Sequence, residues 1–190
     1  MAKVENKTKV ITNLVRFSYL HVFEKVKQEG DTDSDGKYSV SLIIPKSDKE
    51  TIKCIREAIN NAKESAIKEK WNGKNVAVKE SEVLHDGDEE RPEDSAYANS
   101  YFLSAKCNTQ PGLIDAYKNE ITDSRVLYSG CYGRASVTIY GFNVNGKKGI
   151  AVGLNNLQKL KEGEPLGGRA SAQDDFDDDE ALKYIEDEDL

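Results

Sequence analysis

The chain has 190 residues and a formal net charge of −7, from 34 acidic and 27 basic side chains. Its last segment, Asp174–Leu190, holds ten carboxylates and one lysine, a net charge of −9, so the preceding 173 residues carry a net +2. This asymmetry predicts a slightly basic domain followed by an acidic tail that interacts with its own body or with a basic partner.

Composition excludes several classes of protein. No apolar run approaches the roughly 20 residues that span a bilayer, and the N-terminus lacks the hydrophobic stretch of a signal peptide. The cysteines Cys54, Cys107 and Cys131 are widely spaced and odd in number, which fits neither a disulfide framework nor a zinc cluster. We therefore expect a cytosolic protein without a membrane segment, a metal or a cofactor.

Two strands are predicted before Pro45. The segment Thr8–Leu20 is rich in β-branched and aromatic residues and predicts one strand. Apolar and small polar residues alternate over Tyr38–Ile44, which predicts a second strand that Pro45 ends. The segment Asp31–Leu42, which runs from the connection into the second strand, resembles a calcium-binding loop, but Leu42 stands inside that strand where such a loop needs a bidentate glutamate. We interpret it as a turn.

The segment 47–71 is the one clear predicted helix. Ser47 is expected to cap it, with Glu50 as the partner in a capping box. The apolar residues fall on a single stripe, which predicts a scaffold helix packed on the body, without a chemical role. The stripe consists of Ile52, Ile55, Ile59, Ala62 and Ala66.

The rest of the body predicts a polar excursion and more strands. Residues 72–100 are polar and predict a long loop, and Tyr101–Cys107 predicts a strand. Residues 126–160 predict a long β-hairpin, because Asn145 and Gly146 between two extended runs are a strong turn signal. The predicted fold class is mainly β with one long helix, in which about five or six antiparallel strands form a small barrel or strongly curved sheet.

The long strand of this hairpin predicts a nucleic-acid interface. Its small apolar residues alternate with larger polar ones and are expected to face inward; they are Cys131, Gly133, Ala135, Val137 and Ile139. Aromatic rings on the other face can stack on unpaired bases, and Lys and Arg can pair with phosphates. This combination predicts sequence-tolerant binding of single-stranded nucleic acid. The candidate residues are Phe102, Lys106, Tyr128, Tyr132, Arg134, Tyr140, Lys147 and Lys148.

Four segments and the acidic end resemble a known family when taken in order. The segments are VRFSYLHVFE (Val15–Glu24), GKYSVSLIIPKSD (Gly36–Asp48), LHDGDEERPE (Leu84–Glu93) and the long hairpin (Leu127–Leu160). Together they resemble a family of bacteriophage single-stranded-DNA-binding proteins that was long classed as a phage domain of unknown function. The resemblance covers nearly the whole chain.

The resemblance implies an OB-fold, a five-stranded barrel elaborated by a helix and loops, at residues 1–160. A flexible linker and acidic tail would follow at 161–190. In the simplest OB-fold the helix lies between the third and fourth strands. The predicted helix here follows the second strand, so we expect that one strand has been merged or missed.

The resemblance also implies a function. The protein would protect single-stranded DNA exposed in phage replication, recombination or repair, in the cytoplasm of the infected bacterial host, and a homodimer is a further expectation. The acidic tail would occupy the basic groove when DNA is absent and recruit replication or recombination proteins when it is released. Its apolar residues, which would contact those partners, are Phe176, Tyr184, Ile185 and Leu190.

Two alternatives come from other classes of protein. A metal-dependent nuclease would use loop carboxylates such as Asp86 and Asp88, although the phosphate-loop, zinc-protease and serine-hydrolase motifs are absent from the sequence. A phage assembly or host-interaction protein would act through its tail and would bind no DNA even without the tail. We favour a binding protein over an enzyme.

Overall fold

The computed structural model describes residues 1–27, 29 and 35–167. The tail residues Phe176, Tyr184, Ile185 and Leu190, and most of the Asp31–Asp35 segment, lie outside the described residues. The described strands are β1 (Lys3–Asn6), β2 (Lys9–Ile11), β3 (Val15–Val26), β4 (Lys37–Pro45), β5 (His85–Asp86), β6 (Ser100–Cys107), β7 (Gly112–Ile114), β8 (Tyr132–Val144) and β9 (Lys147–Lys161). The helices are α1 (Lys49–Glu69) and α2 (Gly87–Glu90), with short 3-10 turns η1 (Glu80–Glu82) and η2 (Ser95–Tyr97).

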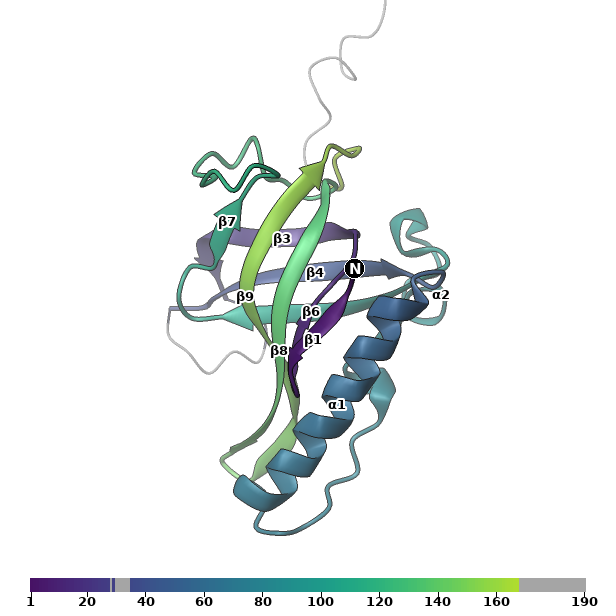
Figure 1. Cartoon of the computed structure of the whole chain (residues 1–190), viewed down its shortest axis with the longest axis vertical. Coiled ribbons are helices and arrows are strands. Elements are labelled where there is room, and N and C mark those ends of the chain that lie inside the picture. Colours follow the sequence, from purple (N-terminus) through teal and green to yellow (C-terminus); the bar gives the residue numbers. More distant parts are fainter. Residues whose placement is uncertain (28, 30–34, 168–190) are drawn as a thin grey trace, which may run out of the picture.

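Five of these strands close into a ring. Strands β3, β4 and β6 form an antiparallel meander. Strand β9 pairs with β6, β8 pairs with β9, and β8 pairs back to β3. In Figure 1 the hairpin of β8 and β9 crosses in front of the meander. This closed ring of strands confirms the predicted OB-fold class. The contact between β6 and β9 is parallel, however, whereas we expected an antiparallel set throughout.

The first predicted strand is two strands. β2 ends at Ile11 and β3 begins at Val15, so the single strand predicted over Thr8–Leu20 was wrong. The chain turns between them because Thr12 and Asn13 bond elsewhere: the hydroxyl of Thr12 accepts from Ala135 N, and Asn13 N donates to Thr51 Oγ1, both at 3.0 Å. β2 lies outside the five-stranded ring, so helix α1 does follow the second ring strand.

Helix α1 fills one side of the barrel as its apolar stripe predicts. All five stripe residues are buried; four of them share one core with the inward residues of β4, β6 and β8, and Ala66 packs against Gly141. The predicted cap was wrong. Asp48, not Ser47, is the N-cap and accepts from Thr51 N at 3.1 Å. Glu50 does not complete a capping box; it accepts a hydrogen bond from Asn13 Nδ2 at 2.9 Å and so ties the N-terminal segment to the helix.

The C-terminal end of α1 holds the β8–β9 hairpin. Lys70 Nζ donates to Gly141 O at 2.9 Å, and Trp71 Nε1 donates to Phe142 O at 3.0 Å. A methyl group at position 141 would lie 2.3 Å from Cβ of Ala66, so only glycine lets the helix approach β8 this closely. In Figure 1 the lower end of α1 lies beside the hairpin tip. The position of the hairpin is therefore fixed by the helix.

The tip of the hairpin is the turn that the sequence predicts. Asn145 and Gly146 both have positive φ, 50° and 80°, as a type I′ turn requires. No helix in the described part of the chain is long and apolar enough to cross a membrane. The three cysteines are free, with Cys131 buried and the other two half-buried.

Lys46 anchors the central part of the excursion between α1 and β6. Lys46 Nζ lies 2.7 Å from Asp86 Oδ1 and 2.8 Å from Asp88 Oδ2, and Asp88 also accepts from Asn99 N at 2.8 Å. The hydrogen bond from Lys46, and after it that from Asn99, lowers the pKa of Asp88. The bonds to Asp86 and then Asp88 raise the pKa of Lys46.

These two shifts give a pH dependence of stability. Because the pKa of Asp88 is lowered in the folded state, its contribution is complete above the unfolded pKa of about 4 and is lost as the pH falls through the folded value. Because the pKa of Lys46 is raised in the folded state, the contribution of Lys46 to stability is constant below a pH of about 10. We therefore expect Lys46→Met to lower the urea midpoint at pH of about 7, with the difference from wild type shrinking at pH of about 3.

Lys74→Met is the control for this measurement, because Lys74 is exposed in the loop after α1 and the change removes the same charge. An equal shift for the two variants, or a Lys46→Met difference that stays constant in acid, would contradict a role for the Lys46–Asp88 pair.

Candidate nucleic-acid interface

A groove of about 640 Å³ lies between β6 and the outer half of the β8–β9 hairpin. Ser104 and Lys106 of β6 line one side, and Tyr140, Phe142 and Lys147 of the hairpin line the other. The other lining residues include His85, Val83, Lys37 and Ile150. We call this the hairpin groove. It brings the rings of Tyr140 and Phe142, both from β8, next to lysines from three other strands.

Small residues on β9 set how the aromatic rings lie. Phe142 of β8 pairs with Gly149, and a methyl group there would come within 2.8 Å of Phe142 Cζ. Tyr140 lies against Gly153, where a methyl group would be 3.4 Å from Tyr140 Cε1. The rings therefore lie close to the β9 backbone. Tyr140 keeps 41% of its surface exposed, which leaves part of the ring available for stacking.

Positive charge dominates the lining. Lys37, Lys106 and Lys147 all line the groove, and Glu82 is the one carboxylate among the lining residues. Lys70 Nζ lies 5.5 Å from the centre of the Tyr140 ring on the side of helix α1. The arrangement can therefore hold a flat, uncharged ring against Tyr140 while lysines approach a negatively charged backbone.

The alternation predicted along β8 is present. The five residues predicted to face inward are all buried, while Tyr132, Arg134, Ser136 and Thr138 are half-buried and Tyr140 is exposed. Of the candidate residues, Lys106, Tyr140 and Lys147 line the hairpin groove, and Lys148 follows Lys147 on β9. The structure thus brings part of the predicted set together.

Phe102 lies beneath this surface rather than on it. Its side chain is only 5% exposed. The imidazole of His85 stacks on it at 5.0 Å between ring centres, and the Tyr97 ring meets it edge-on at 5.0 Å. His85 and Tyr97 come from the excursion, whose packing the local sequence does not reveal. In this arrangement Phe102 supports His85, and His85 is the ring that lines the groove.

Tyr132 and Arg134 lie at the other end of the hairpin. Tyr132 is eight residues from Tyr140, which is about 27 Å along an extended strand. Its ring lies 5.3 Å from the guanidinium of Arg16. Arg134 donates to Thr12 O and Met1 O, both at 2.9 Å, so it holds the N-terminal segment.

Tyr128 belongs to a third region. Its hydroxyl bonds to the Glu162 carboxylate and donates to Gly163 O at 2.9 Å. Burial, followed by the bond to Glu162, raises the pKa of this hydroxyl. Tyr128 lines a separate pocket beside β3.

One further residue of the hairpin groove, Phe142, was predictable from the sequence. Phe142 continues the outward alternation two positions beyond Tyr140, so the same parity argument would have included it. His85 carried no such signal, because its place in the groove depends on the long-range pairing of β5 with β6. Asp86 and Asp88 are bound to Lys46, and the described residues contain no cluster of three potential metal ligands.

The chain is similar to known phage proteins. A family model described as the ssDNA-binding protein of Enterobacter phage Enc34 matches residues 8–189. A putative protein p50 of Acyrthosiphon pisum secondary endosymbiont phage 1 is 32% identical over 96% of this chain and 98% of its own length.

Two solved structures share the fold. The single-stranded DNA-binding protein of bacteriophage Enc34, in complex with ssDNA, superposes with a TM-score of 0.74 at 23% identity, over 87% of this chain and 97% of that one. The single-stranded DNA-binding protein gp2.5 of bacteriophage T7 superposes with a TM-score of 0.57 at 14% identity, over 92% of this chain and 97% of that one.

Proposed function

The chain belongs to the ssDNA-binding protein family of Enterobacter phage Enc34, and we propose that it binds single-stranded DNA in the hairpin groove. The family confirms the resemblance recognised in the sequence segments, and the family model and both solved structures are named for binding ssDNA, which agrees with a binding protein rather than an enzyme. The observation that carries the proposal is the position of the Tyr140 ring in a groove that Lys37, Lys106 and Lys147 also line.

The mechanism follows from the lining. An unpaired base stacks on the exposed part of Tyr140, with Phe142 beside it, and the lysines pair with the flanking phosphates. Every base has a flat face, so binding tolerates any sequence. A paired base is already stacked within the duplex and cannot reach the ring, so the groove prefers single strands.

The proposed biological role is protection of single strands during phage DNA replication, recombination or repair. The acidic tail, with a net charge of −9, is proposed to compete with DNA for the lysines of the groove. Once DNA displaces it, the tail would be free to recruit replication or recombination proteins through its apolar residues. Support for the tail's part comes from its charge and composition alone.

The test is fluorescence anisotropy with a labelled oligo-dT, comparing the full chain with residues 1–173 at several salt concentrations. Three lysines in the groove predict a slope of about −2 in log affinity against log salt, at about −0.7 for each phosphate contact. Removal of the tail should tighten binding, and duplex DNA should compete poorly. If neither protein binds, the alternative of an assembly or host-interaction protein that acts through its tail gains support.

A further inference from the structure

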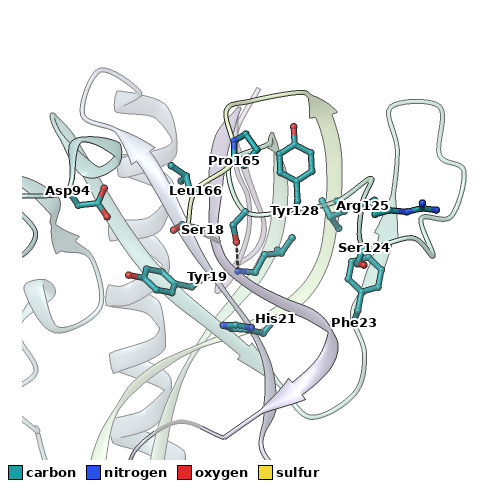
Figure 2. A pocket seen from close by; sticks show the side chains of 14 residues that line it. Ser18, Tyr19, His21, Phe23, Asp94, Ser124, Arg125, Tyr128, Pro165 and Leu166 are labelled. Carbon is teal, nitrogen blue, oxygen red and sulfur yellow. Dashed lines mark hydrogen bonds between the residues drawn. The ribbon is translucent and has the colours of Figure 1, made fainter. Parts of the chain in front are cut away.

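A second cavity, of about 780 Å³, lies on the opposite flank of the same sheet face, beside β3. Figure 2 shows Tyr19, His21, Phe23 and Tyr128 arranged round it, with Arg125 at its outer edge and Leu166 above. We call this cavity the β3 pocket and define it by these six residues. None of the segments that form it belongs to the hairpin groove.

One row of paired residues connects the two cavities. His21 of the β3 pocket pairs with Ser39 on β4, and Ser39 pairs with Lys106, which lines the hairpin groove. Residues directly opposite each other on paired strands point to the same face of the sheet. The two cavities thus flank three strands, a crossing of about 10 Å. Ser39, in the middle of this row, has a short side chain that is only 4% exposed, so a strand crossing here would meet the longer side chains of His21 and Lys106 on either side of it.

Tyr19 has an unusual backbone conformation. Its φ is +45°, a left-handed value that bulky residues seldom adopt, and it lies where the pairing of β3 with β4 shifts between Ser18 and His21. Such irregularities turn a side chain away from its regular direction and often occur at functional sites. The neighbouring residue Leu20 is held through its amide, which donates to Ser129 Oγ at 3.0 Å. The side chain of Tyr19 is therefore 54% exposed, although Tyr19 lies in the middle of β3, one of the five strands of the barrel.

An arginine holds the ring of Tyr19. The guanidinium of Arg91 lies 5.0 Å from the centre of the Tyr19 ring, 4.6 Å from that of Tyr97 and 4.8 Å from that of Phe102. Tyr97 is itself fixed, because its buried hydroxyl donates to Ser18 Oγ at 3.0 Å. Tyr19 is therefore held in place by the rigid interior while part of its ring lines the pocket.

The charges round the β3 pocket suit an uncharged ring better than a phosphate. Arg125 is paired with Asp123 at 2.7 Å, and Asp94, which also lines the pocket, accepts from Ala96 N at 3.1 Å. A phosphate would meet one neutralised cation and one carboxylate. A base would meet the aromatic rings of Tyr19, Phe23 and Tyr128.

We propose that the β3 pocket is a second base-binding subsite in which Tyr19 is the stacking platform. A DNA strand that leaves the hairpin groove crosses β6, β4 and β3 along the row of Lys106, Ser39 and His21, and it places a base against Tyr19. Arg91 is a positioning residue that holds the ring. The proposal rests on the proposed function and extends it from one site to a continuous path.

The test measures affinity for oligo-dT of two lengths, about 4 and about 16 nucleotides, which are the limits of the range of site sizes for OB-folds. Tyr19→Gly in the full chain removes the ring and permits the positive φ. We expect affinity for the longer oligonucleotide to fall about five- to tenfold, and affinity for the shorter one to stay unchanged. Tyr19→Phe, which keeps the ring, should retain wild-type affinity for both.

A spectroscopic readout separates stacking from a structural effect. A 16-nucleotide oligo-dT series carrying one 2-aminopurine at successive positions should show a second quenched position in wild type and Tyr19→Phe, and this quenching should be lost in Tyr19→Gly. Tyr140→Ala serves as the comparison, since it should weaken both lengths. If Tyr140→Ala weakens binding of both oligonucleotides and Tyr19→Gly weakens binding of neither, the β3 pocket is not a base site, and the proposal for the hairpin groove is retained. If neither variant weakens either oligonucleotide, the proposed function itself fails.

Discussion

Tyr140→Ala is expected to weaken binding of a 30-nucleotide oligo-dT by between about fivefold and about a hundredfold. Stacking of a base on an aromatic ring contributes about 1–3 kcal/mol, and each 1.4 kcal/mol is about tenfold in affinity. Tyr140 is 41% exposed and lies over Gly153, so removing its ring takes away the platform and leaves the core intact. Fluorescence anisotropy gives the affinity, and circular dichroism verifies the fold.

Tyr117→Ala is the matched control for this loss. Tyr117 is 87% exposed, in the turn after β7 that Asp115 and Asn119 close, and it lines neither the hairpin groove nor the β3 pocket. Its removal should leave affinity unchanged. A folded Tyr140→Ala protein with wild-type affinity would place the DNA elsewhere on the barrel.

Trp71→Ala is expected to reduce the free energy of unfolding by about 3–5 kcal/mol, the usual cost of replacing a buried Trp by Ala. Trp71 is fully buried beneath the hairpin, where its indole donates to Phe142 O at 3.0 Å. The change leaves a cavity and removes the hydrogen bond to Phe142 O at the wall of the groove. Urea unfolding followed by circular dichroism measures it, because Trp71 is the only tryptophan and its fluorescence is lost with it.

Trp71→Phe separates the loss of the hydrogen bond from the loss of the buried ring. The variant keeps most of the ring and loses the hydrogen bond, so we expect a loss of about 1 kcal/mol. Because the hairpin wall depends on the same contact, Trp71→Ala should also weaken DNA binding under conditions where the protein is still folded. A loss of stability below about 1 kcal/mol for Trp71→Ala would show that the helix end does not hold the hairpin.

Local patterns predicted the elements that depend on local physics. The Asn145-Gly146 turn was predictable because both residues tolerate positive φ, and the buried stripe of α1 was predictable from helical periodicity. The helix cap was less predictable, since Ser47 and Asp48 are both good caps and the competition was decided by the bond from Thr51 N.

The candidate interface was predictable only in part, because the alternation along a strand gives the face of a residue but not its position along the strand. Tyr132 and Tyr140 share a face of β8, yet Tyr132 lies next to Arg16 and Tyr140 lies in the groove. Arg134 was predicted as a phosphate contact, and in the structure its guanidinium also donates to Thr12 O and Met1 O, which the sequence did not indicate. The sequence of β6 could not show that the excursion covers Phe102, because that contact joins residues that only the fold brings together.

The backbone conformation of Tyr19 could not be predicted from the sequence either. A tyrosine in an apolar, β-branched segment is an ordinary strand residue by propensity. Its positive φ occurs where the pairing of β3 with β4 shifts, and the Arg91 that lies over its ring comes from the excursion, between α2 and η2. Both facts depend on the closed ring of strands.

The attachment of the hairpin to the end of α1 has a consequence for the entropy of binding. Flexible binding loops lose conformational freedom when a ligand orders them, and this loss subtracts from affinity. Here Gly141, Phe142 and Asn143 are already bonded to Lys70 and Trp71 before any DNA arrives. The hairpin is ordered when the chain folds, so little of the binding free energy is spent on it. In the proposed binding mode, affinity for DNA is therefore coupled to the stability of the helix end at Lys70 and Trp71.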